Sequence, residues 1–232
     1  METGHLFTQS LSQPSLSQKM WRVSWLLAFG IFDLFLVYVF FLDGSLSTLS
    51  SWSKAVAGTS AVLLGMSLSL SSFGYYFNFL DKHILYRKYL GLAGFWLALL
   101  YSVMLLFVNP ARYFYGFFDN LGTADFVLGL SAMAIFTLMA LVSNNRAMQW
   151  IGPALWRQIL GLGYVAYALL VIRALFIEGE MWIAWWYAGT GLPPARLVIS
   201  VLAVAVLLFR LSVPFAKAWR AKQAPAPSVI VP

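Results

Sequence analysis

Residues 90–108 read LGLAGFWLALLYSVMLLFV, a run of 19 residues without a charged side chain. An α-helix rises about 1.5 Å per residue, so about 20 apolar residues cross the ~30 Å hydrocarbon core of a bilayer. The 232-residue chain holds six long, mostly apolar runs of about this length. The sequence therefore predicts an all-α integral membrane protein with six transmembrane helices in one bundle, at 21–42, 55–78, 87–108, 124–144, 157–177 and 195–215.

The composition agrees with a membrane protein and excludes several other classes. Hydrophobic residues make up 61% of the chain and charged residues 10%, whereas soluble domains carry about 25% charged residues. The absence of cysteine excludes disulfides and thiolate metal sites. A net charge of +7 raises the possibility of nucleic-acid binding. Most of the basic residues fall in short connections between apolar runs, so no nucleic-acid partner is expected.

The basic residues also predict the orientation and the domain boundaries. We expect a polar cytoplasmic tail at 1–19, the transmembrane domain at 20–217 and an Ala/Pro-rich disordered tail at 218–232. Lys54, Arg112 and Arg196 fall on one side of the predicted bundle, and ten lysines and arginines fall on the other. Cytoplasmic connections are rich in Lys and Arg, so both termini are predicted to be cytoplasmic. The ten are Lys19, Arg22, Lys82, Arg87, Lys88, Arg146, Arg157, Lys217, Arg220 and Lys222.

Several charged residues fall within the predicted spans, most of them near span ends, such as Arg210 in the last span, but two lie deeper. Asp33 falls near the middle of the first span, and Arg173 lies in the half of the fifth span that is distant from the predicted cytoplasm. A charge at the bilayer centre costs about 2.5–3.5 kcal/mol on translocon scales, so such groups are usually paired. We expect a buried ion pair between Asp33 and Arg173. The alternative is that Asp33 acts as a proton-relay carboxylate.

Small and aromatic residues form two further patterns. Gly58, Ala61, Gly65, Ser69 and Ser72 recur at helical spacing in the second span, which predicts a close-packed helix face or, alternatively, a ligand groove. The connections 109–123 and 178–194 are rich in Phe, Tyr and Trp. Such residues gather at the membrane–water boundary, so an aromatic belt is expected, with a lid or a docking face as the alternative.

Two segments resemble the ferric-reductase-like transmembrane domain. They are 86–101 (YRKYLGLAGFWLALLY) and 143–160 (SNNRAMQWIGPALWRQIL), which leads on to Arg173. The likeness is in particular to the bacterial haem-binding membrane subunit that serves the periplasmic methionine-sulfoxide reductase. It covers residues 20–217, with six spans in the same order. The resemblance implies a bacterial inner-membrane location and a relation to electron transport.

In that family, histidines on the third and fifth spans hold haem b. The positions that match them here are Tyr101, Leu160 and Arg173. Leucine has no lone pair, arginine stays protonated, and tyrosine is a poor ligand unless it is deprotonated. The only histidines are His5, in the predicted N-terminal tail, and His83, in a predicted connection. No haem of the family type, no metal and no catalytic residue are therefore expected.

Three functions are compatible with these observations. The first is a haem-free, non-catalytic scaffold or accessory subunit of a larger membrane complex, with the bilayer and other membrane subunits as partners. The second is an electron-transfer subunit that uses a quinone, a flavin or unusually ligated haem b. The third is a carrier or binder of a lipophilic small molecule.

Overall fold

The computed structural model describes residues 16–77, 86–189 and 191–223, and these residues confirm the all-α prediction. In this part of the chain, six helices are long and apolar enough to cross a membrane. They are α1 (Leu16–Asp43), α2 (Leu49–Tyr76), α3 (Tyr86–Val108), α5 (Ala124–Val142), α7 (Pro153–Ala188) and α8 (Ala195–Gln223). Within the described ranges, three short helices lie between them: η2 (Ala111–Tyr115), α4 (Phe117–Asn120) and α6 (Asn145–Ile151).

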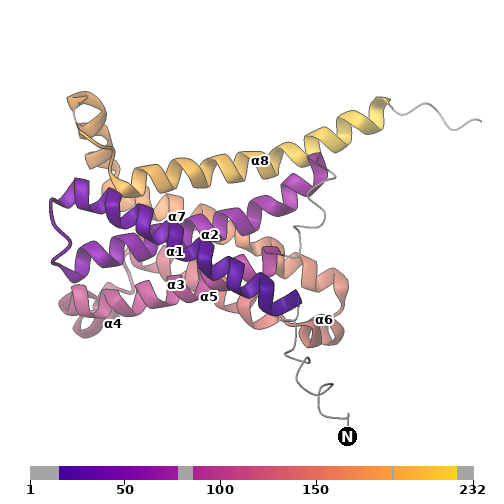
Figure 1. Ribbon diagram of the computed structural model, residues 1–232, viewed down its shortest axis with the longest axis horizontal. Helices are drawn as coiled ribbons and strands as arrows, with labels where there is room; N and C mark the ends of the chain where they lie inside the picture. Colours follow the sequence, from indigo (N-terminus) through magenta and orange to yellow (C-terminus); the bar gives the residue numbers. More distant parts are fainter. Residues whose placement is uncertain (1–15, 78–85, 190, 224–232) are drawn as a thin grey trace, which may run out of the picture.

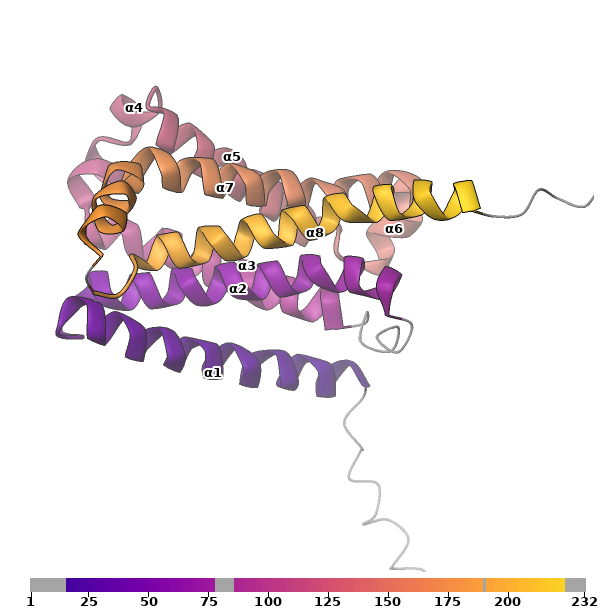
Figure 2. The same cartoon turned by 90° about the horizontal axis from the view of Figure 1, so that it is seen from above.

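The long helices lie side by side in one bundle (Figures 1 and 2). The α1–α2 connection, η2, α4 and the α7–α8 connection gather at one end, which we call the η2 end. The start of α1, the short helix α6 and the last turns of α8 lie at the other end, which we call the α6 end. Successive long helices therefore alternate in direction, as six consecutive membrane crossings require. Which end faces the cytoplasm remains a prediction from the basic residues.

Helix α7 is longer than the sequence predicts. Residues 178–188 were expected to belong to a connection, but the helix continues to Ala188 and has 36 residues, a length of about 54 Å. Glu178 and Glu180 end the apolar run without ending the helix, because glutamate is a good helix former. The helix stops at Gly189, whose left-handed backbone (φ 61°) lets its N–H bond to the carbonyl of Trp185. Figure 1 shows these last turns directed away from the rest of the bundle.

Helix α2 is the central element. In its most apolar window 61% of the residues are buried, against 11–22% for the other five long helices. It packs against α1, α3 and α8, while α5 packs chiefly against α7. Gly58 of α2 lies under the ring of Phe35 on α1, and Gly94 of α3 lies against Leu64 of α2. Gly58 thus lies on a close-packed face of the second span, as the sequence predicts.

Hydrogen bonds from side chains to helix carbonyls reinforce this packing. Tyr167 and Tyr164 on α7 donate to the carbonyl oxygens of Ala61 and Leu68 on α2, at 2.7 and 2.8 Å. Ser60 of α2 donates to the carbonyl of Gly94 at 2.8 Å. A buried hydroxyl needs an acceptor, and a helix carbonyl has a second lone pair to offer. These bonds therefore fix the positions of α7 and α3 relative to α2.

The contact at Gly94 can be tested by adding one methyl group. A Cβ at residue 94 would lie 2.9 Å from Cγ of Leu64 and 3.1 Å from its backbone nitrogen, whereas a Cβ at Gly30 meets nothing within 4 Å. We expect Gly94→Ala to destabilise the protein by about 1–3 kcal/mol through overpacking. Gly30→Ala should be neutral or slightly stabilising. Thermal unfolding in mild detergent measures both, and equal stabilities for the two variants would contradict this packing.

Candidate binding cavity

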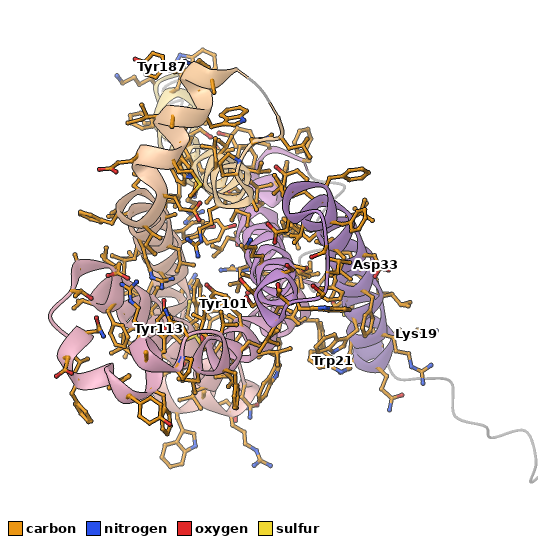
Figure 3. All side chains as sticks on the ribbon, turned by 90° about the vertical axis from the view of Figure 1, so that its left-hand side faces the viewer. Lys19, Trp21, Asp33, Tyr101, Tyr113 and Tyr187 are labelled. Atoms are coloured by element: carbon orange, nitrogen blue, oxygen red, sulfur yellow. The ribbon has the colours of Figure 1, made fainter. Side chains whose placement is uncertain are left out.

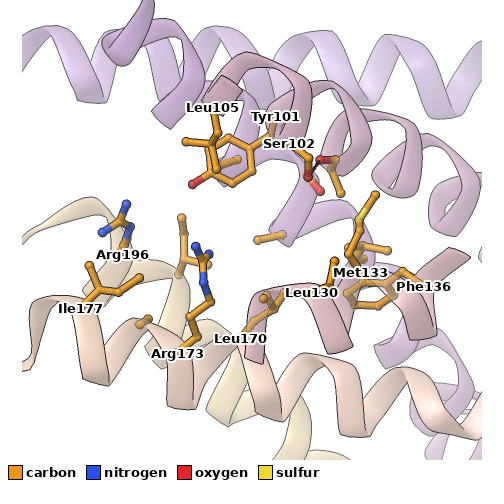
Figure 4. Close-up of a pocket in the computed structure, with 18 of the residues that line it drawn as sticks. Tyr101, Ser102, Leu105, Leu130, Met133, Phe136, Leu170, Arg173, Ile177 and Arg196 are labelled. Atoms are coloured by element: carbon orange, nitrogen blue, oxygen red, sulfur yellow. Dashed lines mark hydrogen bonds between the residues drawn. The ribbon is translucent and has the colours of Figure 1, made fainter. Parts of the chain in front are cut away.

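A cavity of about 420 Å³ lies between α2, α3, α5, α7 and α8. Most of the side chains that line it are apolar, and Figure 4 shows the region between α3, α5 and α7. Nine of the 27 lining residues are small, and their short side chains leave room between the facing helices. The small lining residues are Ala57, Ser60, Ala61, Ala98, Ser102, Gly129, Ala174, Ser200 and Ala203.

Two of the three positions that match the family's haem ligands line this cavity. Tyr101 projects from α3 and Arg173 from α7, and the two side chains point toward one another (Figure 4). The third position, Leu160, is not among the lining residues. The sequence singled out Tyr101 and Arg173 through the resemblance, but it gave no sign of an open space between them.

The backbone of α5 positions the Arg173 side chain. Its Nε donates to the carbonyl oxygen of Asp125 at 2.9 Å. A Cβ on Gly129 would lie only 2.8 Å from the same Nε, so the glycine leaves room for the guanidinium group to lie against α5. Within the described residues, no carboxylate forms an ion pair with Arg173, and no hydrogen bond involves the hydroxyl of Tyr101.

The predicted ion pair between Asp33 and Arg173 does not form in the structure. Helix α1 packs against α2 and α3, whereas Arg173 is carried by α7 and faces the cavity. Asp33 is exposed on α1, at the margin of the bundle in Figure 3. The depths of two residues along their helices, which the sequence gives, do not determine whether the helices are neighbours.

Among the described residues, three ion pairs lie at the η2 end. Lys54 pairs with Asp43, Arg112 with Asp125 and Arg196 with Glu178, at 2.8, 2.7 and 2.6 Å. The three cations are the same lysine and arginines that the sequence assigns to the less basic side. Arg196 also lines the cavity. Sequence reasoning missed these pairs because each of their carboxylates lies in a different segment from its partner.

Aromatic residues of the 109–123 segment cover the η2 end of the cavity. Tyr113 stacks on Phe126 with ring centroids 6.1 Å apart, and Phe117 meets the same ring edge-on at 5.2 Å. Both Tyr113 and Phe117 line the cavity, while their neighbours Tyr115 and Phe118 are about 80% exposed. The segment therefore covers the cavity with one set of aromatic rings and presents another set outward.

The side chains around the cavity do not fit a haem held in the family's manner. A bis-histidine haem needs two neutral imidazoles that face each other, and the corresponding positions offer a phenol, an isobutyl group and a guanidinium group. His5 and His83 lie outside the described residues. The described part of the chain also contains no group of three His, Asp or Glu residues that could hold a metal ion.

No protein-family model matches the sequence, and a comparison with curated proteins finds no match. The resemblance to the ferric-reductase-like domain thus depends on the two motif segments and the order of the spans. The chemistry of the cavity has to be argued from its own residues. The cavity is half-open and mostly apolar, and the guanidinium group of Arg173 and the hydroxyl of Tyr101 lie at its wall.

Double-mutant cycles distinguish the observed ion pairs from the one that the sequence predicted. Arg112 and Asp125 pair at 2.7 Å with the Asp125 side chain only 12% exposed, so Arg112→Met and Asp125→Asn should be coupled by about 1 kcal/mol or more in unfolding free energy. Asp33→Asn and Arg173→Leu should be additive to within about 0.5 kcal/mol. Strong coupling in the second cycle would refute the arrangement of α1 and α7 described above.

Proposed function

We propose that this chain is a haem-free integral membrane protein that holds a lipophilic small molecule in the cavity between α2, α3, α5, α7 and α8. The observation that carries the proposal is the cavity itself, which has a volume of about 420 Å³ and a mostly apolar lining with a few convergent polar groups. Sites for small molecules have volumes of about 300–1,000 Å³ and this kind of lining.

The location of the cavity supports the same proposal. Tyr101 and Arg173 match haem-ligand positions in the family that the chain resembles, so the cavity corresponds to a place where that family holds a large, mostly apolar cofactor. The side chains at these positions no longer suit iron, but they still border an open space. A different occupant with a largely apolar body accounts for both facts.

The wider setting of the protein rests on the resemblance. It supports a bacterial inner-membrane location, a relation to electron transport and a role as an accessory subunit beside other membrane proteins. The outward aromatic residues Trp186 and Tyr187, which are 75% and 85% exposed, suit either the membrane surface or a partner. These assignments remain predictions, which stoichiometric co-purification of partner chains would support.

A cavity-filling substitution tests the binding function. Ala98 lines the cavity, whereas its neighbour Leu99 on the same helix is exposed on the outside of the bundle. We expect Ala98→Trp to occupy the space and to reduce bound lipophilic molecule at least about tenfold, which corresponds to 1.4 kcal/mol. Leu99→Trp adds the same indole to the outer face and should leave occupancy unchanged. Native mass spectrometry of the gently solubilised protein, followed by extraction of its ligands, measures the occupancy.

The result that contradicts the proposal is equally specific. If no small molecule accompanies the wild-type protein and none binds on addition, the cavity does not serve as a binding site. If Ala98→Trp and Leu99→Trp retain the same ligand to the same extent, the molecule lies on the outer surface rather than in the cavity. Unfolding temperatures of the two variants show whether a loss of ligand merely reflects a loss of fold.

The absence of family-type haem is tested separately by spectroscopy. With Tyr101, Leu160 and Arg173 at the ligand positions, the purified protein should show no Soret band, even after expression with excess haem precursor. Arg173→His together with Leu160→His serves as a comparison that restores two imidazoles to α7. A Soret band that follows the unmodified chain through purification would show that the cavity binds haem by other ligands.

A further inference from the structure

The cavity is polar on one side and apolar on the other. Arg173, Tyr101 and Arg196 lie toward the η2 end, while Met133 and Phe136 lie at the opposite end of the close-up in Figure 4. The ring of Phe136 is buried and belongs to the hydrophobic core cluster of α2, α5, α7 and α8. A molecule that fills this space therefore meets hydrogen-bond donors at one end and hydrocarbon at the other.

Two of the three arginines near the polar end are paired with carboxylates. Arg112 is neutralised by Asp125, and Arg196 by Glu178. Arg173 binds only the backbone carbonyl of Asp125, through Nε, and no described carboxylate forms an ion pair with it. The Arg173 guanidinium group thus lies at the wall of a mostly apolar cavity without an ion-pair partner among the described residues. A charge in such a place is costly unless an anion accompanies it.

The two facing side chains both lack an acceptor. The terminal nitrogens of the Arg173 guanidinium group can only donate, and within the described residues they have no acceptor. The Tyr101 hydroxyl also has no hydrogen-bond partner there, and it points toward Arg173 across the cavity (Figure 4). A ligand that satisfies both groups must bring oxygen acceptors and a negative charge to the space between α3 and α7.

From this geometry we propose that the cavity binds a single-chain amphiphile whose anionic oxygen headgroup, a carboxylate or a phosphate, is held between Arg173 and Tyr101. Its alkyl chain extends toward Met133 and Phe136. A volume of about 420 Å³ lies in the lower part of the range for ligand sites, which favours one chain over two. This inference rests on the proposed binding function and specifies the ligand class of the same cavity.

Matched ligands and variants test the headgroup. The full-length protein is reconstituted in uncharged nanodiscs, and binding of oleate, oleyl phosphate and oleyl alcohol is measured by native mass spectrometry. The three ligands share one alkyl chain, and only the alcohol lacks a charge. We expect at least one of the two anions to bind about 10–100-fold more tightly than the alcohol, as is typical of hydrogen bonds to charged groups. The stronger anion identifies whether the headgroup is a carboxylate or a phosphate.

The variants assign that preference to the two side chains. Arg173→Leu should reduce the affinity for the anions to that for the alcohol, whereas Arg173→Lys should keep part of the preference for the anions. Tyr101→Phe should lower the affinity for the anions several-fold. Arg157→Leu is the matched control because Arg157 lies on the same helix, also donates from Nε to a backbone carbonyl, and does not line the cavity. It should bind like the wild type.

Three outcomes would overturn the inference. The first is that the alcohol and the anions bind equally tightly, and the second is that Arg173→Leu still binds the anions more tightly than the alcohol. The third is that Arg157→Leu loses as much anion binding as Arg173→Leu. A mixed result is also informative. If Ala98→Trp abolishes binding of the alcohol but the anions bind no more tightly than the alcohol, the headgroup assignment fails and the binding function stands. If none of the three ligands binds in the cavity, both proposals fail. Ala98→Trp therefore separates the two.

Discussion

The close approach of α2 to its neighbours is the constraint on which the bundle depends. Lipid is as apolar as leucine, so helices in a membrane associate through packing and hydrogen bonds rather than through burial from water. Glycines at the α1–α2 and α2–α3 contacts bring the backbones together, and Ser60 donates to a carbonyl across the α2–α3 contact. Tyr164 and Tyr167 join α7 to α2 by donating to carbonyls of α2. Every other long helix is positioned directly or indirectly by these contacts.

The same small residues explain why the bundle contains a cavity. Where a small residue of α2 faces a large side chain, the helices fit closely, as Gly58 does with Phe35. Ala57, Ala61 and Ala98 line the cavity, and their short side chains leave space beside the closely packed helices. The two interpretations of the second span that the sequence allowed, a packing face and a ligand groove, therefore apply to different parts of one helix.

The sequence predicted the helices well because their length and composition are set locally by the hydrocarbon thickness. The α3 span, for instance, was predicted at 87–108 and begins only one residue earlier. The sequence was less informative about which helices pack against each other. It placed Asp33 and Arg173 at depths that an arginine could bridge, yet the two helices do not pair. It also missed the carboxylate partners of Arg112 and Arg196, because such contacts depend on how distant segments pack. The cavity lay beyond sequence reasoning for the same reason.

The length of α7 has a consequence for how the protein sits in a bilayer. A straight helix of about 54 Å would need a tilt of about 56° to fit within ~30 Å of hydrocarbon, well outside the 0–40° seen for transmembrane helices. Its last turns must therefore leave the hydrocarbon, and they carry Trp182, Trp185, Trp186 and Tyr187. Indole and phenol rings prefer the headgroup layer, so this segment acts as an anchor that sets the immersion depth of the bundle. A thinner or thicker membrane would then shift the other five helices relative to their lipids rather than move this segment.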